Sequence, residues 1–494
     1  MAFQPQTYTN DASPVLHDER REHTWTPLFW HECSFSSEIF TKVMMNLIRN
    51  PNVNSNHLFR ADILMETRDT SDCDHITSEA PRPIQMDAFD LETTIVRRLI
   101  PRNALVDEPL DQTCLIYTGR IVKETKSLVI YLPHVSNPSE VPFYHPSVRG
   151  IAFLHTLGCH LPGVVSIHYS CFTGAQTPSL TRTAYHLLAT LYKHGHGLAT
   201  GYIKRVHHDR LLPQARVQNT YARLKAKYAK TLIAQWVEAT DPTKHVFEDL
   251  GIAAFLIELW ADLYPKPSSF PGFVDIGCGN GLLVHILLEE NYLGWGFDAR
   301  KRKSWDKYPH ETKENLKELV LIPAILHSRG NQADRENTDQ SSVMDTKPRA
   351  AGISIHNGEF AQGTFIISNH ADELTPWTPV LANLSESPFL MIPCCSHNLT
   401  GARFRAPASK QLGVSNSAYA SLVSWVSGLA DSCGWQVEKE MLRIPSTRNT
   451  ALLGRRRTTA FADIDVAEIV EKYGGACGWK ENAMKLVKSG PRGH

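Results

Sequence analysis

The chain has 494 residues, and 51 Lys and Arg residues are balanced by 51 Asp and Glu residues. This length exceeds what one hydrophobic core ordinarily supports and predicts two domains. The zero net charge excludes a global field that attracts anions, so a nucleic-acid surface would need local segregation of charge. No run is typical of a signal peptide or a membrane span, and the ten cysteines include no C-x-x-C pair. We therefore expect a cytoplasmic or nuclear protein with reduced thiols and no membrane partner.

The first half of the chain carries no motif that can be assigned to chemistry. Residues 1–24 are polar and are expected to be disordered, and residues 25–200 are expected to form a separate domain of mixed α/β class. Within it, the run Leu128–Pro133 predicts a strand. Several His and Cys residues lack the pairing of a structural zinc site, so we predict no metal; they are His155, Cys159, His160, Cys171, His207 and His208.

A basic helical connector is expected at residues 201–250. Apolar and aromatic residues recur at spacings of three and four between Val217 and Trp236, which predicts a helix. From Lys204 to Lys230 the chain has eight Lys and Arg residues and one acid. Such charges are typical of a solvated helix face, and also of a face that follows RNA phosphates with Tyr and Trp nearby. Both interpretations stay open at this point.

The most informative segment is Phe273–Gly281. A short apolar run enters a Gly-x-Gly-x-Gly turn, and a second apolar run of helical character follows it. The next short strand ends in an acid at Asp298, as in the βαβ unit of a nucleotide-type cofactor site. Dinucleotide sites usually have the spacing G-x-G-x-x-G. Here Asp275 lies just before the glycines and suits a ligand with an amino group, such as S-adenosylmethionine.

Strand and helix patterns alternate through residues 251–480. A helix is expected at 255–264, further strands at 320–323, 363–368 and 389–393, a helix at 418–433, and a closing hairpin at 436–444 and 450–455. A polar stretch at 327–358 is expected to be a mobile insert, and residues 481–494 a C-terminal tail. This order predicts an α/β, doubly wound, Rossmann-like domain of the class I S-adenosylmethionine-dependent methyltransferases.

In an open α/β sheet, ligands bind beyond the carboxyl ends of the strands. The cofactor is therefore expected at Asp275, Gly277, Cys278, Gly279, Asn280, Gly281, Asp298, Ala299 and Asn369. His370, Asp372 and Glu373 follow the fourth strand and are the catalytic candidates. Alternatively, the two acids are an N-cap and first-turn acids of a helix. Cys394 follows Pro393 at the end of the fifth strand and could attack a base carbon, although a buried Cys is more often a small hydrophobe.

Blocks spread over the second half resemble the tRNA (uracil-2′-O-)-methyltransferases that modify the uridine at tRNA position 44. The blocks are Lys204–Asp209, Lys244–Trp260, Phe273–Gly281, Gly296–Trp305, Ser368–Trp377, Ile392–Cys395, Gly401–Arg405, Leu442–Arg448 and Pro491–His494. Many methyltransferases share the glycine loop, whereas Val246–Trp260 and Asp372–Trp377 are much more specific.

The resemblance implies an enzyme of the cytoplasm that transfers a methyl group from S-adenosylmethionine to the ribose 2′-oxygen of uridine 44 in tRNA-Ser. It implies cofactor contacts at Asp275–Gly281 and Asp298 but transfers no catalytic role. A group must take the hydroxyl proton, for which we expect Asp372 or Glu373, with His370 orienting. The RNA phosphates would be held by Lys204, Arg205, His207, His208, Arg300, Lys301, Lys303, Arg403, Arg405 and Arg448.

Three alternatives remain open. The first is an RNA base C5-methyltransferase that uses Cys394, and the second is a protein or small-molecule methyltransferase whose cations are merely surface charges. The third is a non-catalytic tRNA-binding scaffold with a vestigial cofactor site. The intact set of Asp275, the glycines and Asp298 argues against the scaffold. No accessory protein is identified by the sequence.

Overall fold

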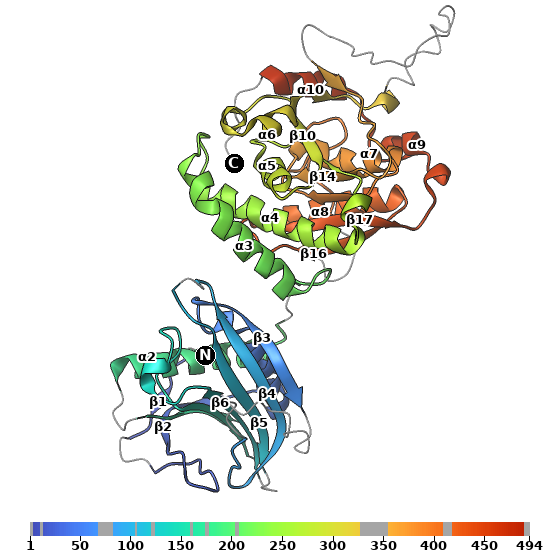
Figure 1. Ribbon diagram of the computed structural model, residues 1–494. Helices are drawn as coiled ribbons and strands as arrows, with labels where there is room; N and C mark the ends of the chain where they lie inside the picture. Colours follow the sequence, from blue (N-terminus) through green and yellow to red (C-terminus); the bar gives the residue numbers. More distant parts are fainter. Residues whose placement is uncertain are drawn as a thin grey trace, which may run out of the picture. The chain divides into compact units, whose positions relative to one another are not determined.

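The computed structural model describes residues 3–9, 13–67, 83–103, 106–119, 124–158, 162–172, 177–202, 207–326, 354–408 and 417–488. The chain divides into two units, Met1–Arg205 and Val206–His494 (Figure 1). Each unit has its own sheet and its own hydrophobic core. The helices expected as a connector at 201–250 belong instead to the second unit, because their apolar faces pack into its core.

The first unit is built on one antiparallel sheet. Its strands are β1 (Gln6–Thr7), β2 (Trp25–Cys33), β3 (Leu58–Thr67), β4 (Phe89–Pro101), β5 (Leu110–Gly119), β6 (Thr125–Pro133), β7 (Gly150–Leu157) and β8 (Gly163–Ser170). They lie in the order β1-β2-β8-β7-β6-β5-β4-β3. The strand expected at Leu128–Pro133 is confirmed within β6.

Two helices, α1 (Ser37–Arg49) and α2 (Pro178–Ala199), pack on this sheet. Side chains of a strand point alternately to its two faces. Accordingly, Val129 and Tyr131 join the core that contains the helices, whereas Leu128 and Ile130 join a second core. The unit therefore has apolar side chains to cover on both faces of the sheet.

The described part of residues 1–24 differs from the expected disordered segment. Gln6 and Thr7 pair with β2, and Leu16 is buried in the second core. The carboxylate of Asp18, itself buried, accepts hydrogen bonds from two backbone N–H groups of the turn that follows it. The segment is ordered because it supplies an apolar cover for one face of the sheet.

The second unit contains a seven-stranded sheet. Its strands are β9 (Phe273–Ile276), β10 (Gly294–Asp298), β11 (Leu316–Glu318), β14 (Phe365–Asn369), β15 (Phe389–Ile392), β16 (Trp435–Met441) and β17 (Thr450–Arg457). They lie in the order β11-β10-β9-β14-β15-β17-β16, with five parallel strands and β17 antiparallel to both of its neighbours. The expected doubly wound fold is confirmed, and the chain reverses direction across the sheet between β9 and β14.

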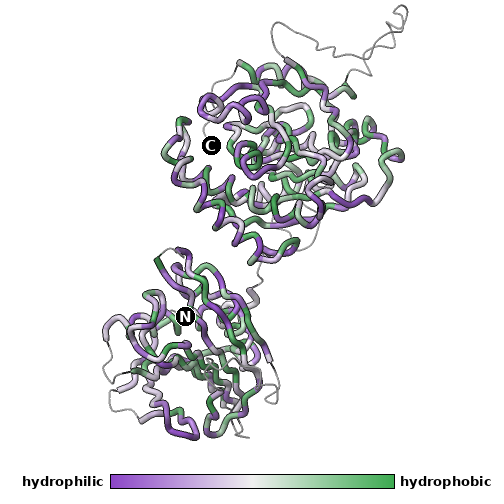
Figure 2. The backbone as a smooth tube through the Cα atoms, viewed as in Figure 1, coloured by the Kyte–Doolittle hydropathy of each residue, from purple (hydrophilic) through white to green (hydrophobic). Residues whose placement is uncertain are grey.

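Helices cover both faces of this sheet. The helices α3 (Gln214–Ala234), α4 (Pro242–Leu263) and α5 (Leu282–Glu289) share one core with Phe273 and Leu390. The helices α7 (Thr378–Leu384), α8 (Ala418–Ser432), α9 (Val466–Lys472) and α10 (Trp479–Lys488) share the other core with Val274 and Met391. Hydrophobic segments accordingly gather in the interior of the unit (Figure 2). Among the described residues, no helix combines the length and apolar character needed to cross a membrane.

Three expectations for the second unit need correction. The third strand of the main sheet is β11, whereas β12 (Val320–Leu321) pairs with β13 (Ile355–His356) in a separate two-stranded sheet. Of the insert expected at 327–358, residues 327–353 lie outside the described residues, and the remainder contains β13. The tail expected at 481–494 is helical as far as Lys488, because Trp479 is buried and donates a hydrogen bond to the backbone oxygen of Leu321.

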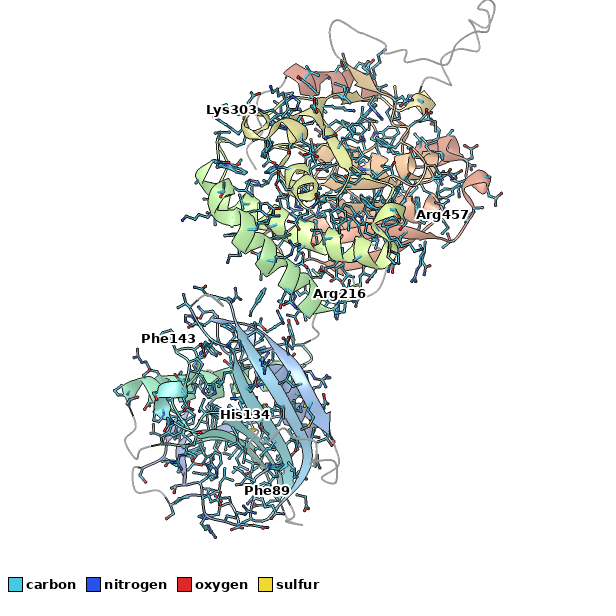
Figure 3. The ribbon with its side chains drawn as sticks, in the orientation of Figure 1. Phe89, His134, Phe143, Arg216, Lys303 and Arg457 are labelled. Atoms are coloured by element: carbon cyan, nitrogen blue, oxygen red, sulfur yellow. The ribbon has the colours of Figure 1, made fainter. Side chains whose placement is uncertain are left out.

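The basic helix predicted at 217–236 is α3, and several of its cations are paired within the unit. Arg216 contacts both Glu258 and Asp262 of α4, at 2.9 and 2.8 Å (Figure 3 labels Arg216). Arg223 and Lys227 contact Glu290 at 2.6 and 2.9 Å. These ion pairs favour a structural role for the three cations over a face that follows phosphates.

We expect the buried carboxylate of Glu440 to anchor the start of the second unit. Glu440 is 3% exposed, and its carboxylate accepts hydrogen bonds from the backbone N–H groups of Asp209, Arg210 and Leu211 at 2.8, 2.7 and 2.9 Å. In Glu440→Gln an amide N–H2 group would face backbone donors, which should lower the free energy of unfolding by about 1–3 kcal/mol in urea denaturation. The control Glu318→Gln, on the exposed part of β11, should change it by less than about 0.5 kcal/mol. Equal losses in the two variants would contradict the anchor.

Candidate active site

A cavity of about 460 Å³ lies at the carboxyl ends of β9, β10, β14 and β15. This is the edge at which an open α/β sheet binds ligands. Of the expected cofactor residues it is lined by Asp275, Gly277, Cys278, Gly279, Asn280, Asp298, Ala299 and Asn369. His370, Asp372 and Glu373 line it as well. The structure therefore brings the cofactor candidates and the catalytic candidates to one cavity.

The glycine loop between β9 and α5 follows a backbone path that favours glycine. Gly279 has a φ of 53°, and a β-carbon there would meet no atom within 4 Å, so this stretch of backbone is open to a ligand. Gly281 has a φ of 75° but serves packing, because a β-carbon there would lie 2.7 Å from Leu316. Gly281 is accordingly absent from the cavity lining. Trp305 donates an indole hydrogen bond of 2.9 Å to the backbone oxygen of Gly279 and supports the loop from behind.

Asp298 connects the end of β10 to the glycine loop. Its carboxylate accepts hydrogen bonds from the backbone N–H groups of Gly279 and Arg300, both at 3.1 Å. The guanidinium of Arg302 lies 3.4 Å from the same carboxylate. A carboxylate has about four lone-pair sites, so Asp298 keeps capacity to accept ligand hydroxyls. The acid therefore holds the loop in shape and still faces the cavity.

Two buried side-chain oxygen atoms in this cavity have no hydrogen-bond partner among the described residues. They are Oδ1 of Asp275, whose residue is 1% exposed, and Oδ1 of Asn369. Burial raises the pKa of Asp275 well above its ordinary value, and the neighbouring acids Asp249 and Asp298 raise it further. Unpaired buried acceptors cost stability, and a ligand that brings an ammonium group would satisfy them. The residues present thus fit S-adenosylmethionine, which has such a group.

Sequence reasoning missed two acids of α4 that line the same cavity, Glu248 and Asp249. The carboxyl of Asp249 accepts the side-chain amide of Asn369 at 3.0 Å, and Glu248 lies 3.0 Å from Nε2 of His370. Burial, followed by the charge of Glu248, raises the pKa of Asp249 to about 7. The available signal was a pair of adjacent acids directly before the apolar run at residues 250–257, at positions where both acids are buried, which is rare for charged residues.

The loop after β14 is strained where the catalytic candidates lie. His370 and Asp372 have φ values of 52° and 44°, in the left-handed region that disfavours residues with a side chain. The short helix that begins at Asp372 has Ala371 as its N-cap and no side-chain cap, so the N-cap part of the alternative interpretation is wrong. Both acids do lie in the first turn of this helix, as the same interpretation expected. Such strain persists only when the surrounding structure holds it, and it is common in active sites.

Asp372 and Glu373 have different surroundings within this loop. The thiol of Cys394 donates a hydrogen bond of 3.0 Å to Oδ1 of Asp372. The hydrogen bond with Cys395 and burial raise the pKa of the Cys394 thiol. Glu373 is buried and lies 3.7 Å from Nε2 of His397. Asp372 is therefore connected to the end of β15, whereas Glu373 supports the loop from inside the fold.

The residues expected to bind phosphates fall into three groups among the described residues: some line the cavity, some are exposed elsewhere, and some have structural partners. Arg300 and Arg448 line the cavity. Lys303, Arg403, Arg405 and His207 are exposed, and Figure 3 labels Lys303. Lys301 pairs with Asp306 at 2.5 Å, and Nδ1 of His208 is hydrogen-bonded to the backbone oxygen of Met441, so both have structural partners. Lys204 and Arg205 lie outside the described residues.

Family models match both units of the chain. One, described as "TRM44-like, N-terminal bet v1-like domain", matches residues 6–205. Another, described as "Predicted AdoMet-dependent methyltransferase", matches residues 211–323. The second match spans α3, α4 and the glycine loop, so it covers much of the cavity described above.

Curated relatives match the chain over nearly its whole length. A protein of Neurospora crassa is 53% identical over 508 aligned residues, which cover 99% of this chain and 98% of the relative. A protein of Schizosaccharomyces pombe is 38% identical, with 99% and 98% covered. One of Saccharomyces cerevisiae is 38% identical, with 93% and 92% covered. All three are named tRNA (uracil-O(2)-)-methyltransferase.

We expect the binding of S-adenosylmethionine to release a proton near neutral pH. Asp249 has a pKa of about 7 and is therefore largely protonated below that pH and ionised above it. A ligand with net positive charge favours the ionised carboxyl, so its dissociation constant should rise up to about tenfold for each pH unit below about 7 and level off above it. Calorimetric titration across this range measures the effect.

In Asp249→Asn the same titration should show a weaker pH dependence and fewer protons released. The matched control is Asp463→Asn, because Asp463 is exposed and is absent from the cavity lining. An unchanged pH dependence in Asp249→Asn would show that another group supplies the proton.

Proposed function

Since the chain belongs to the tRNA (uracil-O(2)-)-methyltransferase family, we propose that it 2′-O-methylates the ribose of uridine 44 in tRNA-Ser, in the cytoplasm. The family assignment and the fold make it an S-adenosylmethionine-dependent tRNA methyltransferase. Position 44 and tRNA-Ser are proposals that come from the resemblance of the sequence blocks. The observation that best supports the active site is the cavity itself. It is lined both by the two unsatisfied oxygen acceptors and by the strained loop after β14.

The chain's own residues have to position the reactants and handle one proton. Bound S-adenosylmethionine supplies a methyl group that is already activated by the sulfonium, so correct placement provides much of the acceleration. Asp275 and Asn369 provide acceptors for an ammonium group, and the open backbone at Gly279 lets a ligand approach closely. We assign these three residues, with Asp298, to cofactor binding.

Activation of the ribose hydroxyl is assigned to Asp372. Its carboxylate lines the cavity and lies next to the end of β15, where an acceptor would enter beside the cofactor. His370 is a positioning residue, because Glu248 holds its imidazole at 3.0 Å. Glu373 is less suited than we expected from the sequence, since it is buried and lies close to His397.

The alternative of base methylation through Cys394 has weaker support. A nucleophilic cysteine needs its thiolate form and a group that stabilises it. Here the thiol of Cys394 instead donates its hydrogen bond to a carboxylate, Asp372. The names of the relatives also specify an oxygen as the methylated atom. These observations favour ribose methylation.

Labelled S-adenosylmethionine and unmodified tRNA-Ser, with nucleoside mass spectrometry, test the proposal. We expect 2′-O-methyluridine, and none when uridine 44 of the tRNA is replaced. Asp372→Asn should lower kcat by at least about 100-fold, because activation of the hydroxyl is lost. The control Asp463→Asn should keep full activity. Any product that Cys394→Ala forms should still be methylated on the ribose and not on a base. A methylated base, or full activity of Asp372→Asn, would contradict the assignment.

RNA binding should depend on the cations at the carboxyl edge of the sheet. Arg448 is exposed, its guanidinium lies over the ring of Tyr419, and it donates to the backbone oxygen of Cys394 at 3.1 Å. If it contacts a phosphate, Arg448→Ala should reduce the slope of log affinity against log salt by about one.

Arg456 offers a matched control for this measurement. It is exposed near the C-terminal end of β17, which is antiparallel to β15, and so lies at the opposite edge of the sheet. Arg456→Ala should leave the salt slope unchanged in a filter-binding or anisotropy titration with tRNA. Equal effects of the two substitutions would show that no phosphate is held at the cavity edge by Arg448.

A further inference from the structure

Three potential metal ligands converge at the carboxyl edge of the sheet. Within the part of the chain that the structure describes, one group of His, Cys, Asp or Glu side chains has its ligand atoms gathered for an ion: Asp372, Cys394 and Cys395. Their three ligand atoms all lie within 4.8 Å of one another. The sequence did not predict this site, because Asp372 precedes Cys394 by 22 residues and the chain has no C-x-x-C pair.

The fold brings these ligands together from two neighbouring strands. The two cysteines follow Pro393 at the end of β15, and Asp372 comes from the loop after β14, which pairs in parallel with β15. Asp372 reaches this position with a strained φ of 44°. All three side chains line the cavity of the proposed active site, so an ion held there would face the substrate.

The donor set selects a class of metal. Thiolates bind softer or borderline ions, whereas Mg²⁺ and Ca²⁺ prefer sites made of oxygen. Two thiolates and one carboxylate match tetrahedral Zn²⁺, for which catalytic sites have three protein ligands and an open fourth position.

We propose that Asp372, Cys394 and Cys395 bind one Zn²⁺, with the fourth coordination position open towards the cavity. The two thiol protons leave to solvent as the ion binds, and the carboxylate contributes its existing charge. The identity of the fourth ligand rests on the proposed function: it would be the ribose 2′-hydroxyl. A hydroxyl bound to Zn²⁺ would lose its proton to solvent water far more readily than a free one, and its oxygen would then take the methyl group as the bond from that group to the sulfonium sulfur breaks. Asp372 would take part in this activation as a ligand of the ion.

The charges around the cluster are compatible with the ion. Two thiolates, one carboxylate and Zn²⁺ leave one net negative charge. Arg403 acts electrostatically on Cys395, and Arg448 donates a hydrogen bond to the backbone oxygen of Cys394. These cations can balance the remaining charge. Two of the proposed ligands form a thiol–carboxylate hydrogen bond of 3.0 Å, from Cys394 to Asp372, which a bound ion would replace.

Metal binding by the full-length reduced protein tests the proposal without tRNA. After removal of metal with a chelator, Zn²⁺ would be titrated against a chromophoric competitor, and Co²⁺ would be added to a second sample as a spectroscopic substitute. We expect one high-affinity Zn²⁺ per chain and a thiolate-to-cobalt charge-transfer band. Cys394→Ser, Cys395→Ser and Asp372→Asn should each weaken Zn²⁺ binding at least about 100-fold. Mutation of a direct ligand should cost no less than the 10–100-fold loss typical of outer-shell partners.

The matched control is Cys477→Ser, because Cys477 is an exposed free cysteine of the same unit and lies outside the cavity. It should keep the Zn²⁺ stoichiometry and the cobalt band. Binding of S-adenosylmethionine by each variant confirms that the second unit is folded. The proposal is overturned if wild-type protein binds no stoichiometric Zn²⁺, or if Cys477→Ser loses as much affinity as the three ligand variants.

Activity measurements separate this proposal from the proposed function. Unchanged 2′-O-methylation by metal-free protein in excess chelator would overturn the role of the ion and leave the function standing. Stoichiometric Zn²⁺ that depends on the three ligands, in a protein that transfers no methyl group to tRNA, would support the metal site and contradict the function.

Discussion

The site depends above all on the burial of carboxyl groups that the chain alone does not neutralise. Asp275 lies near the carboxyl end of β9 with one oxygen unsatisfied, and Asp249 of α4 lies close enough for the charges of the two acids to oppose each other. Such an arrangement costs free energy in the absence of a ligand. It becomes favourable when a cation enters, which explains why the cavity suits a ligand with an ammonium and a sulfonium group.

The doubly wound topology explains why these acids meet the catalytic loop. The chain leaves the sheet's centre at β9, builds one side, and returns to form β14 on the other side of β9. Polar residues at both strand ends therefore border one crevice. The helix α4 closes this crevice with Glu248 and Asp249, which reach His370 and Asn369. One helix thus contacts both a residue that we propose binds the cofactor and a residue that we propose positions the acceptor.

Periodicity and glycine chemistry made much of this fold predictable. The glycine loop, the acid at Asp298 and the strand pattern were enough to predict the residues that we propose bind the cofactor. These features are local, and each meets a physical requirement at a fixed spacing. Less predictable were elements whose order depends on distant partners, such as Leu16 under the first sheet and α10 beside β12. Their local sequence is polar or short, and only packing against the rest of the unit decides their structure.

The sequence by itself determined the fold class, the cofactor loop and the family, since blocks of residues at set spacings specify them. Tertiary structure alone decided which acids act together. Glu248 and Asp249 lie far along the chain from His370 and Asn369, whereas Asp372 lies 22 residues from Cys394. No spacing rule connects them, because the crossing of α4 and the pairing of β14 with β15 set their distances. Packing also bears on an alternative that the sequence left open, because cations of α3 form ion pairs with acids of α4 and with Glu290 at the end of α5.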